Sequence, residues 1–243
     1  MRAMVLAAAI GLSCWAEGCQ NESMEGRNPD PSGSPREETR LTRAPSYFVE
    51  REFWLALAEE PRWHLEEART RYLAGKTREA ARELEKVAAI LTFETRHGHG
   101  RRERDLLYSS VSELREVARQ LRLGTDKAPG SPSLAEFDRV LSLTFRTIAA
   151  HDVALGRDAL EAGDARMTGR YMQETVGALR TGFEIGGITL GSALSSDLDQ
   201  AQAAAIELET AGRGTRAGVS TNLRRLNQAL RKLEETLTGQ GGA

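Results

Sequence analysis

Two histidines stand where a helical chain could bind a metal ion or a haem. His64 lies between Leu57 and Ala68 at helical spacing, and His151 follows Ile148 in the same way. Each imidazole is therefore expected on the apolar stripe of its helix. Imidazole nitrogens bind transition metals and haem iron, and bundle cores build such sites from facing helices. The spacing makes His64 and His151 a candidate ligand pair for haem or a transition metal.

The alternative for both histidines is a structural role. A core-facing histidine commonly hydrogen-bonds a neighbouring carbonyl or carboxylate. Glu60, Glu67 or Asp152 could serve as such a partner. The chain does not contain the two Glu-x-x-His motifs of a carboxylate-bridged di-metal bundle, and it has no Cys-x-x-Cys-His motif for covalent haem.

Other polar clusters give weaker signals. His97 and His99 could grip a transition metal, but arginines follow them and loop histidines are usually solvated. The glycine-rich run 186–191 has no preceding strand and no lysine, so it indicates a helix break rather than a phosphate-binding turn. The serine pairs 109–110 and 195–196 have no recognisable base beside them. Without a catalytic set, we do not expect an enzyme.

The composition indicates an α-helical protein. Of 243 residues, 40% are hydrophobic, 28% are charged and only 5% are aromatic, with a formal net charge of −2. Alanine, leucine, glutamate and arginine are abundant, and these residues lose little freedom in a helix. A near-neutral chain lacks the basic surface that binds nucleic acid, so we expect no nucleic-acid partner.

The first 18 residues have the layout of a signal peptide. Arg2 precedes an apolar run, residues 4–16, that is too short to span a bilayer. Ala16-Glu17-Gly18-Cys19 then resembles the lipobox of bacterial lipoproteins, in which the cysteine is acylated and becomes the first mature residue. The resemblance implies a lipid anchor on Cys19. Acylation of Cys14, or simple cleavage after Gly18, are the alternatives, and each of them still implies export.

Residues 19–45 are expected to form a disordered tether. Four of the seven prolines fall in this segment, which contains few apolar residues. Such a segment cannot bury enough surface to offset its ordering entropy. Gln20, directly after the cysteine, resembles the outer-membrane sorting pattern. We therefore expect an exported, periplasmic protein that is held at the outer membrane by its lipid alone.

Apolar residues recur at steps of three and four from residue 46 onward. This pattern predicts an all-α bundle of about six to seven helices, the first of them kinked at Pro61. The stretch 72–78 reappears as 160–166, and His64 corresponds to His151. We interpret the chain as a duplicated three-helix unit, residues 46–124 and 133–212, joined by a linker at 125–132. The two halves would then pack around a pseudo-twofold axis.

The C-terminal segment, residues 213–243, has no counterpart in this duplication. It is expected to form an amphipathic helix followed by a flexible tail. Its leucines step by three and four, which leaves two interpretations, a helix laid along the bundle or a homodimer contact. These leucines are Leu223, Leu226, Leu230, Leu233 and Leu237.

Small and apolar residues recur along one predicted helix pair in each half. In the first half they are Ala68, Tyr72, Gly75, Ala80, Leu84 and Ala88. This spacing resembles tetratricopeptide-type hairpins and is similar to the hairpins of YfdX-type exported helical proteins. The resemblance covers about thirty residues in each half and implies a helical interaction module. We therefore expect an envelope protein as the partner, with a haem- or metal-binding bundle as the alternative function.

Overall fold

The computed structural model describes residues 61–97, 101–123 and 132–239, and all regular structure in these ranges is α-helical. A helical segment at residues 61–73 comes first. It is followed by α2 (Thr77–His97), α3 (Arg101–Leu123), α4 (Leu134–Glu161), α5 (Ala165–Ile185), α6 (Ser192–Ala211) and α7 (Arg216–Gly239). The predicted all-α bundle is confirmed. The signal peptide, the tether and the chain before Pro61 lie outside the described residues, as does most of the linker at 125–132.

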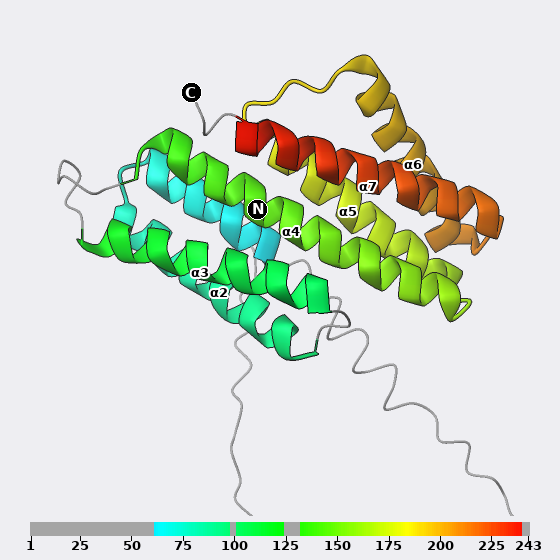
Figure 1. Cartoon of the computed structure of the whole chain (residues 1–243), viewed down its shortest axis with the longest axis horizontal. Helices are drawn as coiled ribbons and strands as arrows, with labels where there is room; N and C mark the ends of the chain where they lie inside the picture. The colour runs from blue at the N-terminus through cyan, green and yellow to red at the C-terminus, as the bar shows by residue number, and fades with distance from the viewer. Residues whose placement is uncertain (1–60, 98–100, 124–131, 240–243) are drawn as a thin grey trace, which may run out of the picture. The chain divides into compact units, whose positions relative to one another are not determined.

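Helix α4 is the longest helix described and packs against three others. It has 28 residues, which corresponds to about 42 Å. Figure 1 shows α4 running between the α2–α3 hairpin and α7. It contacts α3, α5 and α7, and more than half of its residues are buried. A helix buried on several faces needs apolar or small residues around most of its circumference, and most of the buried residues of α4 are of these kinds.

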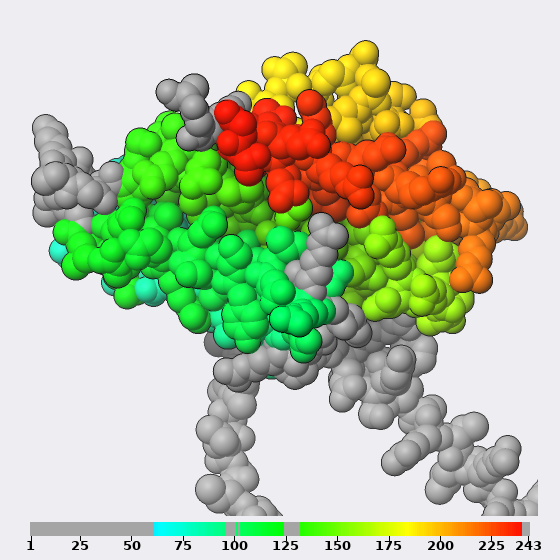
Figure 2. All heavy atoms as spheres, in the orientation of Figure 1, coloured from blue at the N-terminus to red at the C-terminus, as the bar shows by residue number. Residues whose placement is uncertain are grey.

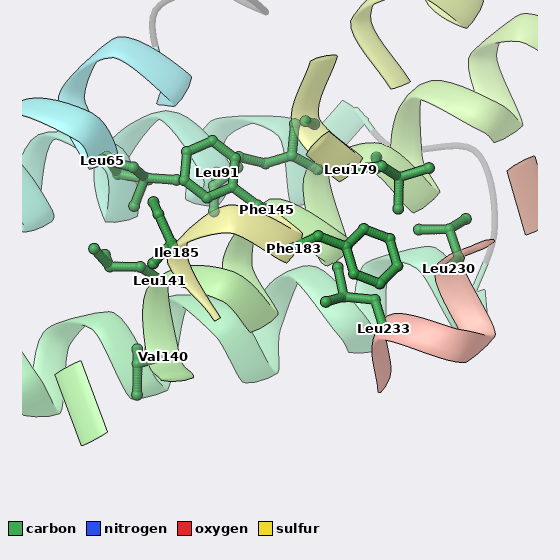
Figure 3. Packing of buried hydrophobic residues seen from close by; sticks show 14 of the residues in the cluster. Leu65, Leu91, Val140, Leu141, Phe145, Leu179, Phe183, Ile185, Leu230 and Leu233 are labelled. Atoms are coloured by element: carbon green, nitrogen blue, oxygen red, sulfur yellow. The ribbon is translucent and has the colours of Figure 1, made fainter. Parts of the chain in front are cut away.

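Helices α4, α5 and α7 share a close-packed core. Phe183 of α5 lies beside Leu230 and Leu233 of α7 (Figure 3), and all three side chains are buried. Gly182 makes this approach possible, because a Cβ there would stand 3.0 Å from Leu233 and 3.3 Å from the Cβ of Phe145 on α4. The crossing therefore depends on the missing side chain at Gly182.

The leucine seam of α7 faces the bundle. Each of its five leucines is at most 5% exposed. Figure 2 shows the outer surface of α7 alongside α6. Ion pairs flank the seam. Arg146 of α4 pairs with Glu234, and Arg225 lies 3.2 Å from Asp197 of α6. The structure thus agrees with a helix laid along the bundle, and a homodimer through the C-terminal helix stays a prediction.

The turn after residue 73 has the same geometry as the turn after residue 161. Gly75 and Gly163 both have positive φ, +72° and +76°. Their amides donate to the carbonyls of Tyr72 and Leu160, at 3.0 and 3.1 Å. A left-handed residue closes a helix in this way, and glycine adopts it at least cost. Each matching pair is 88 residues apart, and the duplication of the three-helix unit stays a prediction.

The start of α4 is capped by a side chain. Ser133 is the N-cap, and its side chain accepts a hydrogen bond from the amide of Glu136 at 3.2 Å. The glycines at 186–187 end α5, since the amide of Ile188 donates back to the carbonyl of Phe183 at 2.9 Å. None of the helices described is both long and apolar enough to cross a membrane.

Candidate functional site

His64 lies in the core and contacts a carboxylate of the neighbouring helix. Its Nδ1 atom is 2.6 Å from Oε2 of Glu83 on α2, and the ring packs edge-on against Trp63. Both side chains of the pair are largely buried, 8% and 15% exposed. This described partner, Glu83, is not one of the carboxylates suggested by sequence proximity, and Glu60, which is one of them, lies outside the described residues. Glu83 is 19 residues away and becomes adjacent only when α2 folds back.

Glu83 is held by the side chains of Lys86 and His64. The half-exposed Lys86 donates to it at 2.9 Å, and His64 contacts it from the core. Burial acts to raise the pKa of Glu83, but the hydrogen bonds and charges of Lys86 and His64 outweigh it, so the pKa lies below its usual range. The His64 ring is thereby tied to an ionised carboxylate.

His151 also faces a carboxylate of α2, at a second point along that helix. Its Nε2 atom is 3.9 Å from Oε2 of Glu94, and both side chains are buried. Glu83 and Glu94 are eleven residues apart, which is about 16 Å along a helix axis. The two histidines that the sequence paired are thus each engaged with a different residue of α2.

The described residues contain no group of three or more metal-binding side chains that could hold an ion. A haem or metal site at His64 and His151 stays a prediction. His99 and Cys19 lie outside the described residues, and so does the side chain of His97. Ser110, from one of the serine pairs, is buried in α3. Its hydroxyl donates to the hydroxyl of Thr147 in α4 at 2.8 Å and so joins the two helices.

A buried polar cluster surrounds Asp152, beside His151. We call it the Asp152 cluster; its members are Arg62, Glu94, His151, Asp152 and Glu174. They come from the segment 61–73, from α2, from α4 and from α5. Asp152 is only 3% exposed, and His151 is 9% exposed. The cluster therefore joins four helical elements through polar groups inside the bundle.

Arg62 supplies the guanidinium of the Asp152 cluster. Its Nη1 atom pairs with the carboxylate of Glu174 and also donates to the backbone carbonyl of the same residue at 3.3 Å. Gly177, one turn further along α5, leaves space for the guanidinium, since a Cβ there would stand 2.7 Å from Nη2. The side chains of Arg62 and Glu174 are 23% and 18% exposed. Glycine at 177 thus admits a cation between the helices.

Burial changes the protonation of the two remaining carboxyl groups. It raises the pKa of Glu94 to about 7. Burial also raises the pKa of Asp152 well above its usual range, the negative charges of Glu94 and Glu174 add to this rise, and Arg62 opposes it. Near neutral pH the cluster therefore holds a proton that ordinary carboxylates would have lost.

The sequence indicates only part of this cluster. Proximity suggests Asp152 as a partner for a histidine, but it does not point to Arg62, Glu94 or Glu174. One signal is present, because Asp152 occupies an apolar helical register, four residues after Ile148 and four before Gly156. A carboxylate on the buried stripe of a helix requires partners from other helices.

Large apolar side chains at the surface are distributed unevenly. Of the seven that are 40% or more exposed among the described residues, five precede α4. They are Trp63, Leu73, Phe93, Tyr108 and Leu123, and the other two are Leu134 and Ile206. Helix α7 packs on α4, α5 and α6 and so covers the second half of the chain.

Comparisons with known proteins found no relative of this chain. No family model matches the chain, and searches among curated proteins and solved structures found no match. Any functional proposal therefore rests on the N-terminal sequence, the helical fold, the exposed apolar side chains and the Asp152 cluster.

Proposed function

We propose that this chain is an exported, lipid-anchored helical protein that binds a partner protein in the bacterial cell envelope, as an interaction or scaffold module. The N-terminal sequence supports export, and the resemblance of Cys19 and its neighbours to a lipobox supports the anchor. The observation that carries the binding role is the set of exposed apolar side chains before α4. A haem- or metal-binding bundle that uses His64 and His151 is the alternative hypothesis.

The exposed side chains are of the kind that contribute most to protein interfaces. Trp63 is 58% exposed and Tyr108 is 56% exposed. Tryptophan and tyrosine are enriched among the residues whose truncation costs the most binding energy. In the second half, α7 packs its buried leucines against α4, α5 and α6 and so covers their apolar surface. We infer that a partner covers part of the surface of the first half.

Site-specific crosslinking in the full chain tests this role. A photoreactive amino acid placed at Trp63 or Tyr108 should give the same discrete adduct with one exported protein. The same substitution at Ile206, which is 46% exposed in α6, is the matched control and should give none. Circular dichroism establishes that each variant is folded. Folded variants that give no adduct, or the same adducts at all three positions, would contradict a partner site on the first half.

A further inference from the structure

The segment 61–73 and α2 run antiparallel and meet along one stripe of α2. Arg71 pairs with Glu79 at 2.9 Å. His64, which comes earlier in the segment, contacts Glu83 at 2.6 Å, one turn further along α2. The two contacts fix which residues of the pair lie opposite each other.

The same stripe of α2 continues beyond the level of His64. Steps of three and four residues keep side chains on one face of a helix, and they lead from Glu83 on to Ile90 and Phe93. Ile90 is half-buried, and Phe93 is 40% exposed. The described segment begins at Pro61, only three residues before His64. This part of the stripe therefore extends past the start of the segment.

The second half of the chain shows a hairpin of this kind at greater length. Helix α4 has 28 residues and packs along α5, where a Cβ at Gly182 would stand 3.3 Å from the Cβ of Phe145. The two matching glycine turns are 88 residues apart. The same offset leads from Phe145 back to Leu57. It leads from Gly182 back to Glu94, the neighbour of Phe93, so it predicts that Leu57 lies at the level of Phe93.

The contact between His64 and Glu83 indicates nearly the same level independently. Trp54 precedes His64 by ten residues, and Phe93 follows Glu83 by ten. In an antiparallel pair, equal steps in opposite directions from one contact end opposite each other. The register of the first half therefore places Trp54 opposite Phe93, within one turn of the level expected for Leu57.

Residues 46–60, which lie outside the described residues, have a composition that suits this part of α2. They include four glutamates and one arginine, whereas residues 61–123 carry 14 lysines and arginines against 10 acidic residues. An acidic, apolar segment joined directly to Pro61 meets this more basic half at a high effective concentration. Seven of its fifteen residues are large and apolar: Tyr47, Phe48, Val49, Phe53, Trp54, Leu55 and Leu57.

We propose that residues 46–60 dock on the C-terminal half of α2, with Trp54 and Leu57 packed against Phe93. Ile90 lies on the same side of α2, one turn before Phe93, and widens the apolar contact. Aromatic side chains bury large areas and pack ring against ring. The docking goes beyond the proposed partner binding, because it assigns Phe93 to the chain's own segment and leaves the other exposed apolar side chains of the first half to the partner.

A photoreactive amino acid at Phe93 in the full chain tests the docking. After crosslinking, trypsin releases residues 52–62 as one peptide, because an arginine precedes it and another ends it. We expect the probe to be joined, within one chain, to residues 53–58 of this peptide. The same probe at Ile206, which is 46% exposed in α6, is the matched control and should not join it.

Two outcomes of the crosslinking would overturn the proposal. One is a folded chain whose adducts at position 93 all lie outside residues 46–60. The other is an adduct with residues 52–62 that forms only between two chains, which a mixture of isotopically labelled and unlabelled protein reveals. That result would assign the contact to a second copy.

Hydrogen exchange gives a second readout. In a folded Trp54→Ala, Leu57→Ala double variant, we expect the α2 amides after residue 86 to open about tenfold or more often, because two large buried side chains are lost. Leu73→Ala, 55% exposed at the other end of the segment 61–73, is the matched control and should leave these amides unchanged. Natural protection after residue 86 in the folded double variant would overturn the docking.

Discussion

His64 and Glu83 are joined at 2.6 Å between Nδ1 and Oε2, across the hairpin that the segment 61–73 forms with α2. Their side chains are largely buried, so little water can replace this contact. The contact closes the hairpin about three turns of α2 away from the contact between Glu94 and His151. Two histidine–carboxylate contacts thus hold α2 at two points along its axis, Glu83 and Glu94.

The coupling between His64 and Glu83 should be measurable in a double-mutant cycle. We expect His64→Gln and Glu83→Gln each to destabilise the chain, with a coupling energy of about 1 to 2 kcal/mol. Chemical denaturation of the four proteins gives this value. Strictly additive effects would mean that the two side chains do not stabilise each other.

The same coupling should weaken in acid. The pKa of Glu83 is lowered in the folded chain, so its contribution is present above the unfolded pKa and lost as the pH falls through the folded one. The double-mutant cycle repeated at pH 3.5 should therefore give a smaller coupling than at pH 7. An equal or larger coupling in acid would contradict this direction.

The alternative function has a direct test on the same histidines. If His64 and His151 are structural, a chelator should leave the melting temperature unchanged, and the purified chain should show no visible absorption band. A coloured or metal-loaded protein that loses its metal or its band in His64→Ala and His151→Ala would instead favour the haem or metal hypothesis.

Close packing of α5 on α6 depends on Gly169. A Cβ at this position would stand 2.6 Å from the backbone oxygen of Ala205 and from the backbone nitrogen of Glu209. Because backbone atoms cannot move aside cheaply, we expect Gly169→Ala to destabilise the chain by about 2 kcal/mol despite its better helix propensity. Gly156→Ala in α4 is the control, since its nearest neighbour would be Tyr171 at 3.4 Å, an ordinary contact. Denaturation curves showing equal effects at the two glycines would contradict the close approach.

The two matching turns should respond alike to mutation. Gly75 and Gly163 have nearly the same positive φ, and a Cβ at either position would meet open space, so backbone strain is the only expected cost. We expect Gly75→Ala and Gly163→Ala each to cost about 1 kcal/mol in unfolding free energy. A large difference between them would argue against equivalent turns in a duplicated unit.

The helices could be predicted from the sequence because their signals are local. Apolar spacing, the Ser133 cap and the glycines at 75 and 163 each act within one or two turns of chain. The histidine partners could not be predicted in this way. Glu83 and Glu94 reach their histidines only after α2 folds back. No sequence pattern near His64 or His151 indicates which residue of α2 will lie opposite each histidine.

The Asp152 cluster shows the same limit more strongly. Its residues are spread along the sequence from Arg62 to Glu174. Their charges act on one another only after the helices bring them into one buried space. The resemblance to exported helical families and the lipid anchor stay predictions, since they concern the surface and the N-terminal residues rather than the packing of the helices.

The lipid anchor on Cys19 is the central claim, because the proposed partner must be met in the cell envelope. The most direct measurement is incorporation of a radioactive fatty acid into the full chain in a bacterial host that processes lipoproteins. We expect label in the natural chain and in Cys14→Ser, and none in Cys19→Ser. Label that survives in Cys19→Ser, or a natural chain that takes up none, would contradict the account.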